Sequence, residues 1–207
     1  MFHRTPAAGV PESAFVDESG LSFADKPTLV GDRVLLRPVG TADLPGLVEM
    51  LQDAESMRLT GSHGDRDLDL GVAENWYATR VDHDDRLDLA IVERESGGYV
   101  GEVVLNELDT GNRSCGFRIC LVGPRAFGRG FGTEATRLIL AHAFDTVGVH
   151  RIELEVYAFN PRARHVYEKA GFVHEGTKRQ ALRWDGDWVD AHLMAMLASD
   201  WNDAQPG

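Results

Sequence analysis

The sequence predicts a single α/β domain built around a mixed, mostly antiparallel sheet with helices against it. Its 207 residues are the length of one large domain, and no internal repeat divides them. Three consecutive apolar segments separated by turn residues predict antiparallel strands in the middle of the chain. Two strand–helix units and a final hairpin follow, and this order is typical of a mixed sheet rather than a purely parallel one.

The first part of the chain predicts an arm, a strand and two helices. Residues 1–27 are rich in Pro, Gly, Ser and acidic side chains, so we expect a flexible or peripheral arm ahead of one domain over residues 28–203. The first strand is predicted at Asp32–Val39. Thr41 is a suitable N-cap for a helix whose apolar residues recur at helical spacing, and a second helix is expected over Val72–Arg80.

Beyond these helices the apolar period changes to that of strands. The segments LDLAIVERE and YVGEVVLNEL are separated by SGG, which predicts a hairpin, and DTGN turns the chain into RSCGFRICLV. A long helix is expected over Thr133–Thr146, a buried strand over residues 151–159, and a helix over residues 161–170 that stops at Gly171. The segments FVHEGTKRQ and WVDAHLMAMLAS predict the final hairpin.

Composition and charge narrow the class of protein. A net charge of −12 is unfavourable for general binding to nucleic acid, where contacts to phosphates dominate the affinity. No apolar run approaches the roughly 18 residues of a membrane span, and the N-terminus has no apolar stretch of a secretory signal, which favours the cytoplasm.

The two cysteines are not expected to form a disulfide. If they belong to one strand, Cys115 and Cys120 would lie about 16 Å apart, so we expect two free thiols. No Cys or His cluster has metal-ligand spacing.

The densest glycine stretch, AFGRGFGTEA, stands just before the long helix. Backbone N–H groups at a helix start lack partners and bind anions, and glycines allow the backbone to approach closely. Arg125 and Arg129 add positive charge, so the stretch favours a phosphate, in particular a pyrophosphate. A tight turn whose glycines serve only geometry stays open as the alternative. The P-loop lysine is absent, and Thr133 stands where the dinucleotide fingerprint needs glycine.

A second motif, NPRARHVYEKAGF, follows the predicted strand over residues 151–159. Asn160 is a good N-cap and Pro161 fits the first helical position. Helical spacing places Asn160, Arg164 and Tyr167 along one face, which would form a polar stripe leading to a tyrosine hydroxyl. A core aromatic residue with its hydroxyl at the edge is the alternative for Tyr167.

Together, GRGFGTEA, the strand after its helix and NPRARHVYEKAGF resemble the GNAT superfamily of acyl-CoA-dependent N-acyltransferases. The likeness covers about Val30 to Trp201, and the ending DGDWVDAHLMAMLASDW is similar to the branch that acetylates ribosomal-protein N-termini. Phe127 departs from the motif, which usually has Arg or Gln at that position. The resemblance implies a central sheet that is splayed in the middle and holds the pantetheine arm of acetyl-CoA in the gap.

The resemblance also assigns the parts of an acetyl-CoA site. The strand before the glycine turn would offer backbone hydrogen bonds to pantetheine at Ile119, Cys120 and Leu121. The turn would bind the pyrophosphate through Phe127, Gly128, Arg129, Gly130, Phe131, Gly132 and Thr133. Asn160 would contact the cofactor near the opening. Arg164 would help to bind the adenosine phosphates, or else make an outward salt bridge.

The reaction implied is direct attack of an amine on the thioester in one ternary complex, without a metal. Tyr167 is the expected general acid for the CoA sulfur, because an ordinary tyrosine pKa of about 10 keeps the hydroxyl protonated at neutral pH. Glu102, an acid in an apolar strand, is the first candidate for the general base, with an outward-facing strand residue as the alternative. Weaker candidates are Glu107, His142 and His165. Cys120 as an acyl-carrying nucleophile is a further alternative that direct transfer does not need.

The acceptor amine is expected to enter opposite the cofactor, over the first two helices and the last hairpin. Carboxylates crowd that half of the sequence at Asp65, Asp67, Asp69, Asp82, Asp84 and Asp85. Such runs are usually solvated surface, but they would also attract a cationic acceptor. The branch resemblance favours the α-amine of a protein or peptide ahead of a small cationic amine. A non-catalytic acyl-CoA-binding or nucleotide-binding module stays open, as does a homodimer.

Overall fold

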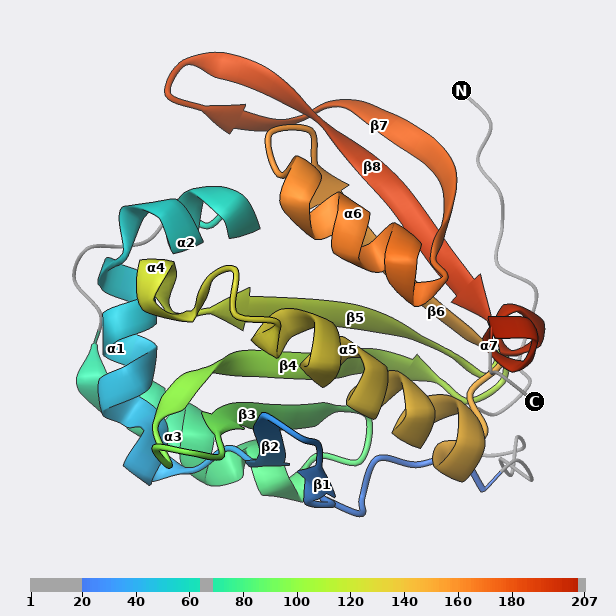
Figure 1. The fold of residues 1–207 in the computed structure, drawn as a ribbon, viewed down its shortest axis with the longest axis horizontal. Coiled ribbons are helices and arrows are strands. Elements are labelled where there is room, and N and C mark those ends of the chain that lie inside the picture. The colour runs from blue at the N-terminus through green and yellow to red at the C-terminus, as the bar shows by residue number, and fades with distance from the viewer. Residues whose placement is uncertain (1–19, 64–68, 205–207) are drawn as a thin grey trace, which may run out of the picture.

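The computed structural model describes residues 20–63 and 69–204, which fold into one eight-stranded sheet flanked by helices (Figure 1). The strand order is β1-β2-β3-β4-β5-β6-β8-β7, and every neighbouring pair is antiparallel except β5 and β6. The strands are β1 (Leu29–Val30), β2 (Val34–Pro38), β3 (Leu87–Glu93), β4 (Tyr99–Asp109), β5 (Ser114–Leu121), β6 (Arg151–Tyr157), β7 (Val173–Trp184) and β8 (Asp187–Leu197). The predicted mixed, mostly antiparallel sheet is confirmed.

The helices lie mainly in the connections between these strands. They are η2 (Thr41–Asp43), α1 (Leu44–Gln52), α2 (Ala54–Thr60), α3 (Leu70–Thr79), η3 (Arg80–Asp82), α4 (Gly123–Ala126), α5 (Phe131–Ala141), the π-helical turn η4 (His142–Val147), α6 (Pro161–Ala170) and α7 (Ala198–Ala204). None of the helices within the described ranges has the length and apolarity to cross a membrane.

The sheet is splayed between β5 and β6. These strands pair only over three positions, Ser114–Gly116 against Arg151–Glu153. From Phe117 to Leu121, β5 keeps its pairing with β4 but has no partner strand on its other edge, while β6 pairs with β8 as far as Tyr157. Figure 1 shows β6, β7 and β8 leaving the plane of β5 and β4. The expected splay is therefore confirmed, and one edge of β5 faces a gap.

The two faces of β4 and β5 are covered by different helices. Successive side chains of a strand point to opposite faces. The main core, on the side of α5 and α6, contains buried Val103, Phe117, Ile139 and Ile152. On the other side Tyr77 of α3 packs with the residues Val39, Ala90 and Val92. Glu102 pairs in register with Ala90 and Cys120, which places its side chain on this second face.

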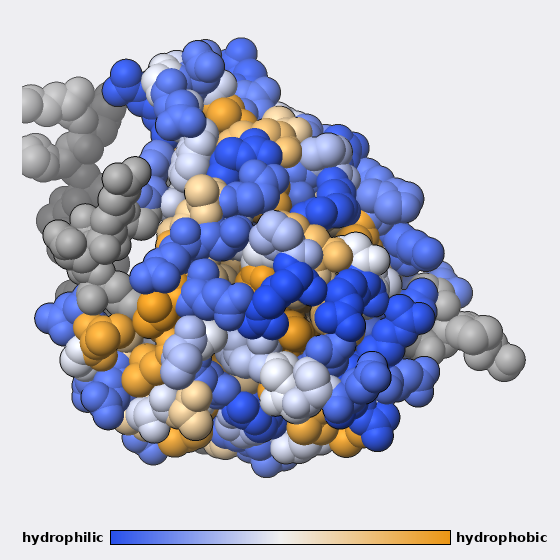
Figure 2. Space-filling model, turned by 60° about the vertical axis from the view of Figure 1, so that its left-hand side comes forward, coloured by the Kyte–Doolittle hydropathy of each residue, from blue (hydrophilic) through white to orange (hydrophobic). Residues whose placement is uncertain are grey.

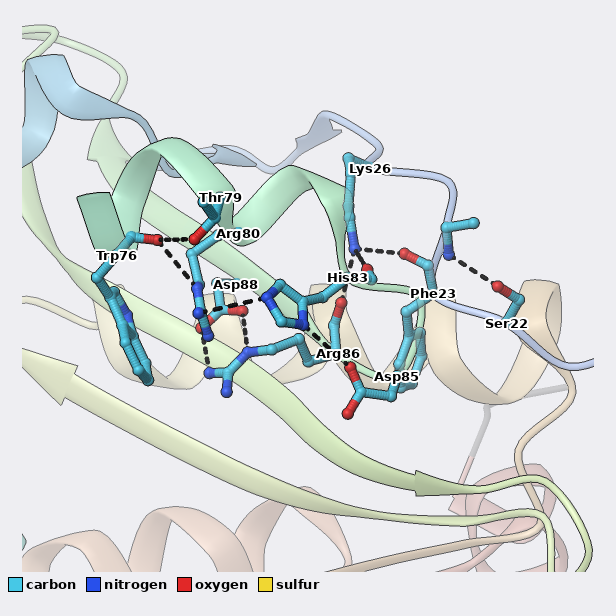
Figure 3. A network of polar contacts seen from close by, with 11 residues as sticks. Ser22, Phe23, Lys26, Trp76, Thr79, Arg80, His83, Asp85, Arg86 and Asp88 are labelled. Carbon is cyan, nitrogen blue, oxygen red and sulfur yellow. Dashed lines mark hydrogen bonds and ion pairs between the residues drawn. The ribbon is translucent and has the colours of Figure 1, made fainter. Parts of the chain in front are cut away.

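The segment just before residue 28, the predicted start of the domain, already packs against the domain. Leu21 and Phe23 are buried in the main core. Lys26 donates from Nζ to the carbonyl oxygens of Phe23, His83 and Arg86 at 2.6, 2.5 and 2.7 Å, which fastens the segment to the loop before β3 (Figure 3). The predicted arm over residues 1–27 is thus wrong for residues 20–27, because two apolar side chains and one lysine outweigh the polar composition. Residues 1–19 of that arm lie outside the described residues.

The helix boundaries differ from expectation where the turns are short. Thr41 begins the 3₁₀ turn η2 instead of capping the helix, and Asp43 accepts a hydrogen bond from the backbone N–H of Gly40. Helices α2, α4 and α7 were not predicted because their short segments show no helical period. The last residues of the predicted long helix form the π-helical turn η4. Cys115 and Cys120 are free thiols, as predicted.

The face shown in Figure 2 is largely polar, with hydrophobic residues in small groups between the polar ones. Among the described residues, the exposed large hydrophobic side chains include Val72 and Trp76 of α3. The guanidinium of Arg80 lies 3.6 Å from the ring centroid of Trp76, so this indole is partly covered by a cation (Figure 3).

Candidate active site

A cavity of about 500 Å³ opens where β5 and β6 separate. Its walls come from α2, β4, β5, the glycine turn, the start of α5, β6 and α6. Its size is within the roughly 300–1,000 Å³ of small-molecule sites. Of the residues predicted for the acetyl-CoA site and of the first candidates for general acid and base, only Arg129 and Arg164 are absent from its lining. Segments far apart in the sequence are therefore brought to one hollow by the splay of the sheet.

The glycine turn forms the N-terminal boundary of α5. Gly128 and Gly130 have positive φ angles of 73° and 84°, a conformation that glycine adopts without strain. A Cβ added at Gly128 would meet no atom within 4 Å, so the turn leaves open space above its backbone. The first helical hydrogen bond here runs from the Glu134 N–H to the Gly130 carbonyl, which leaves the preceding N–H groups of the helix start available to an anion.

The arginines of this region occupy positions that differ from the sequence prediction. Arg129 forms an ion pair with Glu93, stacks over the ring of Phe131 at 4.6 Å and lines a separate hollow behind the turn. Arg125 pairs with Glu49 and donates to the Tyr99 carbonyl at 2.8 Å. Both side chains point away from the main cavity because acidic residues of β3 and α1 hold them. The expected positive charge of Arg125 and Arg129 is therefore not directed at the cavity, while the predicted role of the Arg129 backbone in the turn stays a prediction.

Arg162 of α6 supplies a cation that the sequence analysis missed. It lines the cavity, and its guanidinium carbon lies 4.2 Å from the ring centroid of Phe127. Phe127, the departure from the usual motif, therefore serves as a platform for this arginine beside the glycine turn. The only signal in the sequence was that Arg162 belongs to the first turn of a helix with a clear N-cap.

The exposed edge of β5 brings Ile119, Cys120 and Leu121 to the cavity. Ser56 donates from Oγ to the Leu121 carbonyl at 2.9 Å and accepts from the Gly123 N–H at 3.0 Å, so α2 occupies the end of this edge. Burial raises the pKa of the Cys120 thiol to about 12. The thiol stays protonated at neutral pH, which argues against the alternative of an acyl-carrying cysteine.

Tyr167 lies on α6 with its ring in the core and its hydroxyl at the cavity. The side chain is 7% exposed, and its ring meets Phe117 edge to face at a centroid distance of 5.8 Å and packs on Phe172 at 5.9 Å. Among the described residues none forms a hydrogen bond with the hydroxyl, which is accordingly free to donate into the cavity. Burial raises the pKa of Tyr167, so the hydroxyl is protonated across the physiological range.

The start of α6 is fixed by Asn160. Its Oδ1 accepts from the Ala163 N–H at 3.1 Å as predicted for an N-cap, and its Nδ2 lies 3.4 Å from the Leu59 carbonyl of α2. Arg164 instead forms an ion pair with Glu168 at 2.8 Å and does not line the cavity. The outward salt bridge is thus the alternative found, and the predicted polar stripe through Arg164 is corrected: its side chain lies beside His192 of β8.

Glu102 lies on the opposite face of the sheet from Tyr167. Its Oε1 accepts hydrogen bonds from the hydroxyls of Tyr77 on α3 and Tyr99 at the start of β4. Burial, with a smaller contribution from Asp43, raises the pKa of Glu102 to about 8, while Arg118 acts in the opposite direction. A part-buried carboxylate at the cavity wall with a pKa near the working pH has the properties of a general base.

The other acid and base candidates lie elsewhere. His142 is buried in η4, where burial lowers its pKa, and neither it nor Glu107 nor His165 lines the cavity. Of the acidic loops, Asp65 and Asp67 lie outside the described residues. Asp69 caps α3 by accepting from the Gly71 and Val72 N–H groups, and the remaining predicted carboxylates do not line the cavity: Asp82, Asp84 and Asp85.

The sequence of this chain is similar to those of known acetyltransferases. A profile for the acetyltransferase (GNAT) domain matches residues 33–173. A probable N-acetyltransferase of Bacillus subtilis, YjcK, is 32% identical over 60% of this chain and 68% of its own length, and the spermidine N(1)-acetyltransferase of Vibrio cholerae is 32% identical over 58% and 68%.

A solved structure gives the same result for the fold. The spermidine N-acetyltransferase from Vibrio cholerae in complex with CoA and spermine superposes with a TM-score of 0.75 over 83% of this chain and 99% of that one, at 24% identity. The splayed sheet, the glycine turn before α5 and the domain match agree, and the chain belongs to the GNAT acetyltransferases, a family of acyl-CoA-dependent N-acetyltransferases.

Proposed function

We propose that this protein transfers the acetyl group of acetyl-CoA to a primary amine by direct attack in one ternary complex. The observation that carries the proposal is that one cavity reaches both faces of the sheet. The glycine turn and Tyr167 line it from the side of α5 and α6, and Glu102 lines it from the face that α3 covers. Donor and acceptor can then approach the gap from opposite sides, which positions both for reaction.

The donor is expected to bind along the gap between β5 and α6. The N–H groups at the start of α5 suit its pyrophosphate, with Arg162 close by. The free edge of β5 at Ile119 and Cys120 offers peptide groups to the amides of pantetheine, whereas the Leu121 carbonyl is already bonded to Ser56. Asn160 would act by fixing the start of α6 at the opening.

The chemistry needs one proton acceptor and one proton donor. As the amine nitrogen forms a bond to the thioester carbonyl carbon, it loses a proton, which Glu102 takes directly or through one water. The C–S bond breaks and the sulfur receives the proton of the Tyr167 hydroxyl, which later recovers a proton from solvent. Burial suits Tyr167 to this role because its hydroxyl stays protonated until the sulfur becomes basic.

The acceptor we favour is the α-amine of a peptide or protein, an N-terminal acetylation. Arg118 lines the cavity on the same face as Glu102, and among the described residues it has no ion-pair partner. A fixed positive charge beside the base would repel a second ammonium group, which disfavours a polyamine. A single α-amine with a carbonyl or carboxylate nearby meets no such repulsion.

A small cationic amine is the second candidate. Glu155 of β6 lines the same cavity as Glu102, so two carboxylates face the gap, although Lys178 pairs with Glu155. The relative in Vibrio cholerae is named for acetylation of spermidine.

The protein is expected to act in a reducing compartment such as the cytoplasm, because both of its cysteines are free thiols.

The experiment is thiol release from acetyl-CoA with a panel of amines: peptides with free N-termini, their N-blocked counterparts, spermidine and single amino acids. Release that requires the free α-amine supports the first candidate, and release with spermidine alone supports the second. Binding of acetyl-CoA by calorimetry without thiol release for any amine would favour a non-catalytic acyl-CoA module. Binding of ATP or NAD instead of acetyl-CoA would contradict the proposal.

A further inference from the structure

One oxygen of Glu102 is held by two tyrosines that come from different parts of the chain. Tyr77 reaches Oε1 from α3, and Tyr99 reaches the same atom at 2.8 Å from the start of β4. Glu102 lines the cavity, and among the described residues no donor binds its Oε2. The carboxylate is therefore fastened on its outer side and open on the side of the cavity.

Both tyrosines are themselves fixed by packing. Tyr77 is 2% exposed and lies in the cluster with Val39 and Ala90. The ring of Tyr99 lies against α1 at Gly46, where an added Cβ would be 2.2 Å from the ring, so the absence of a side chain there makes room for it. Arg125 binds the Tyr99 carbonyl at 2.8 Å. Two rigid donors aimed at one oxygen define the orientation of a carboxylate.

We propose that Tyr77 and Tyr99 are positioning residues that hold Glu102 by Oε1, keep Oε2 directed at the acceptor amine, and favour the ionised carboxylate. This inference rests on the proposed function only for the role of Oε2. Hydroxyl donors stabilise a carboxylate ion relative to the acid, and they do so most where water is excluded. Without them, burial would raise the pKa of the carboxyl further, and the ionised base would form only at higher pH.

The charged and titratable groups around Glu102 are few. They come from η2, β2, β3 and β5, and are Asp43, Arg37, Asp88, Arg118 and Cys120. Asp43 forms an ion pair with Arg37 at 2.7 Å, and Asp88 forms one with Arg86 at 2.6 Å. The negative charge of each carboxylate is therefore balanced by an arginine. The thiol of Cys120 is protonated at neutral pH. The two tyrosine hydroxyls are thus the direct hydrogen-bonding influence on the carboxylate, with Arg118 as the nearby cation.

The test is a titration of Glu102 itself. In protein labelled with ¹³C at glutamate carboxyl carbons, the Glu102 signal is identified by its loss in Glu102→Gln, and its pKa is read in the parent, Tyr77→Phe and Tyr99→Phe. Each substitution keeps the ring and removes one donor, so the pKa should rise by about one unit. Thr79→Val is the matched control on α3, because its hydroxyl bonds only to backbone carbonyls of its own helix, and it should leave the pKa unchanged.

A pKa of Glu102 that is the same in the parent and in both phenylalanine variants overturns the inference. If one variant does not fold, the other decides. The pH profile of kcat/KM gives a second readout: its ascending limb should move to higher pH in the variants, and by the same amount for acceptors of different amine pKa. If no amine is acetylated by the parent, the proposed function fails, while the NMR shift still tests the two tyrosines.

Discussion

Asn160 joins the two walls of the cavity, because it caps α6 and its amide nitrogen lies 3.4 Å from the carbonyl of Leu59 on α2. Asn160→Ala should lower the free energy of unfolding by about 1 kcal/mol, the usual value of a lost N-cap. Asn160→Asp keeps the capping oxygen and loses only the long contact to Leu59, so most of the stability should return. Urea denaturation measures both, and equal stability of Asn160→Ala and parent would contradict this role.

The glycine turn should bind the donor through its open backbone. Gly132 has no positive φ, and an added Cβ would lie 3.5 Å from Leu121, an ordinary contact. Gly132→Val should therefore fold but place a branched side chain in the cavity, and weaken acetyl-CoA binding about tenfold or more in calorimetry. Gly132→Ala is the matched control with a smaller loss. Gly130→Val should also weaken binding, but its φ of 84° adds strain, so it is the less direct test.

Two neighbouring arginines of α6 separate the inner and outer faces of that helix. Arg162 lines the cavity on the ring of Phe127, whereas Arg164 is paired with Glu168 outside it. Arg162→Ala should raise the KM for acetyl-CoA by about fivefold and reduce its dependence on salt, since the proposed contact of this arginine with a phosphate would be lost. Arg164→Ala should change neither. An equal rise in the KM for acetyl-CoA in both variants would contradict this account, because it would mean that Arg164 also binds the cofactor phosphates.

Glu102 should make stability depend on pH. Its pKa is raised to about 8, so in the window between about pH 4.5 and pH 8 the folded protein retains a proton that the unfolded chain has released. The buried carboxyl therefore destabilises the fold increasingly as pH rises through that window. Relative to the parent, Glu102→Gln should gain about 1 kcal/mol or more between pH 4.5 and pH 8. Glu107→Gln, an exposed position on the same strand, is the control, and a difference that does not vary with pH would refute the assignment.

The sequence predicted those parts of the fold and site that depend on local pattern. The glycine turn, the cap at Asn160 and the position of Tyr167 follow from spacing within single segments, and the structure brings them to one cavity. Arg162 and Arg164 could not be told apart, because which of the two arginines faces inward depends on how α6 packs against α5 and β6. The contact of Tyr77 with Glu102 spans 25 residues between a helix and a strand, and no local pattern reports such a pair. Residues 20–27 were misassigned because two buried side chains decide their position.

The central claim is that Tyr167 protonates the leaving sulfur, and its direct test is a single turnover of Tyr167→Phe. The ring packs on Phe117 and Phe172, and phenylalanine retains that packing while removing only the hydroxyl. Fold and acetyl-CoA affinity should therefore change little. With enzyme in excess over acetyl-CoA, the rate of acetyl transfer should fall by about 10²-fold, the range for a lost general acid. Transfer at the parent rate in that single turnover would contradict the claim and leave Tyr167 as a core residue, with water as the proton donor.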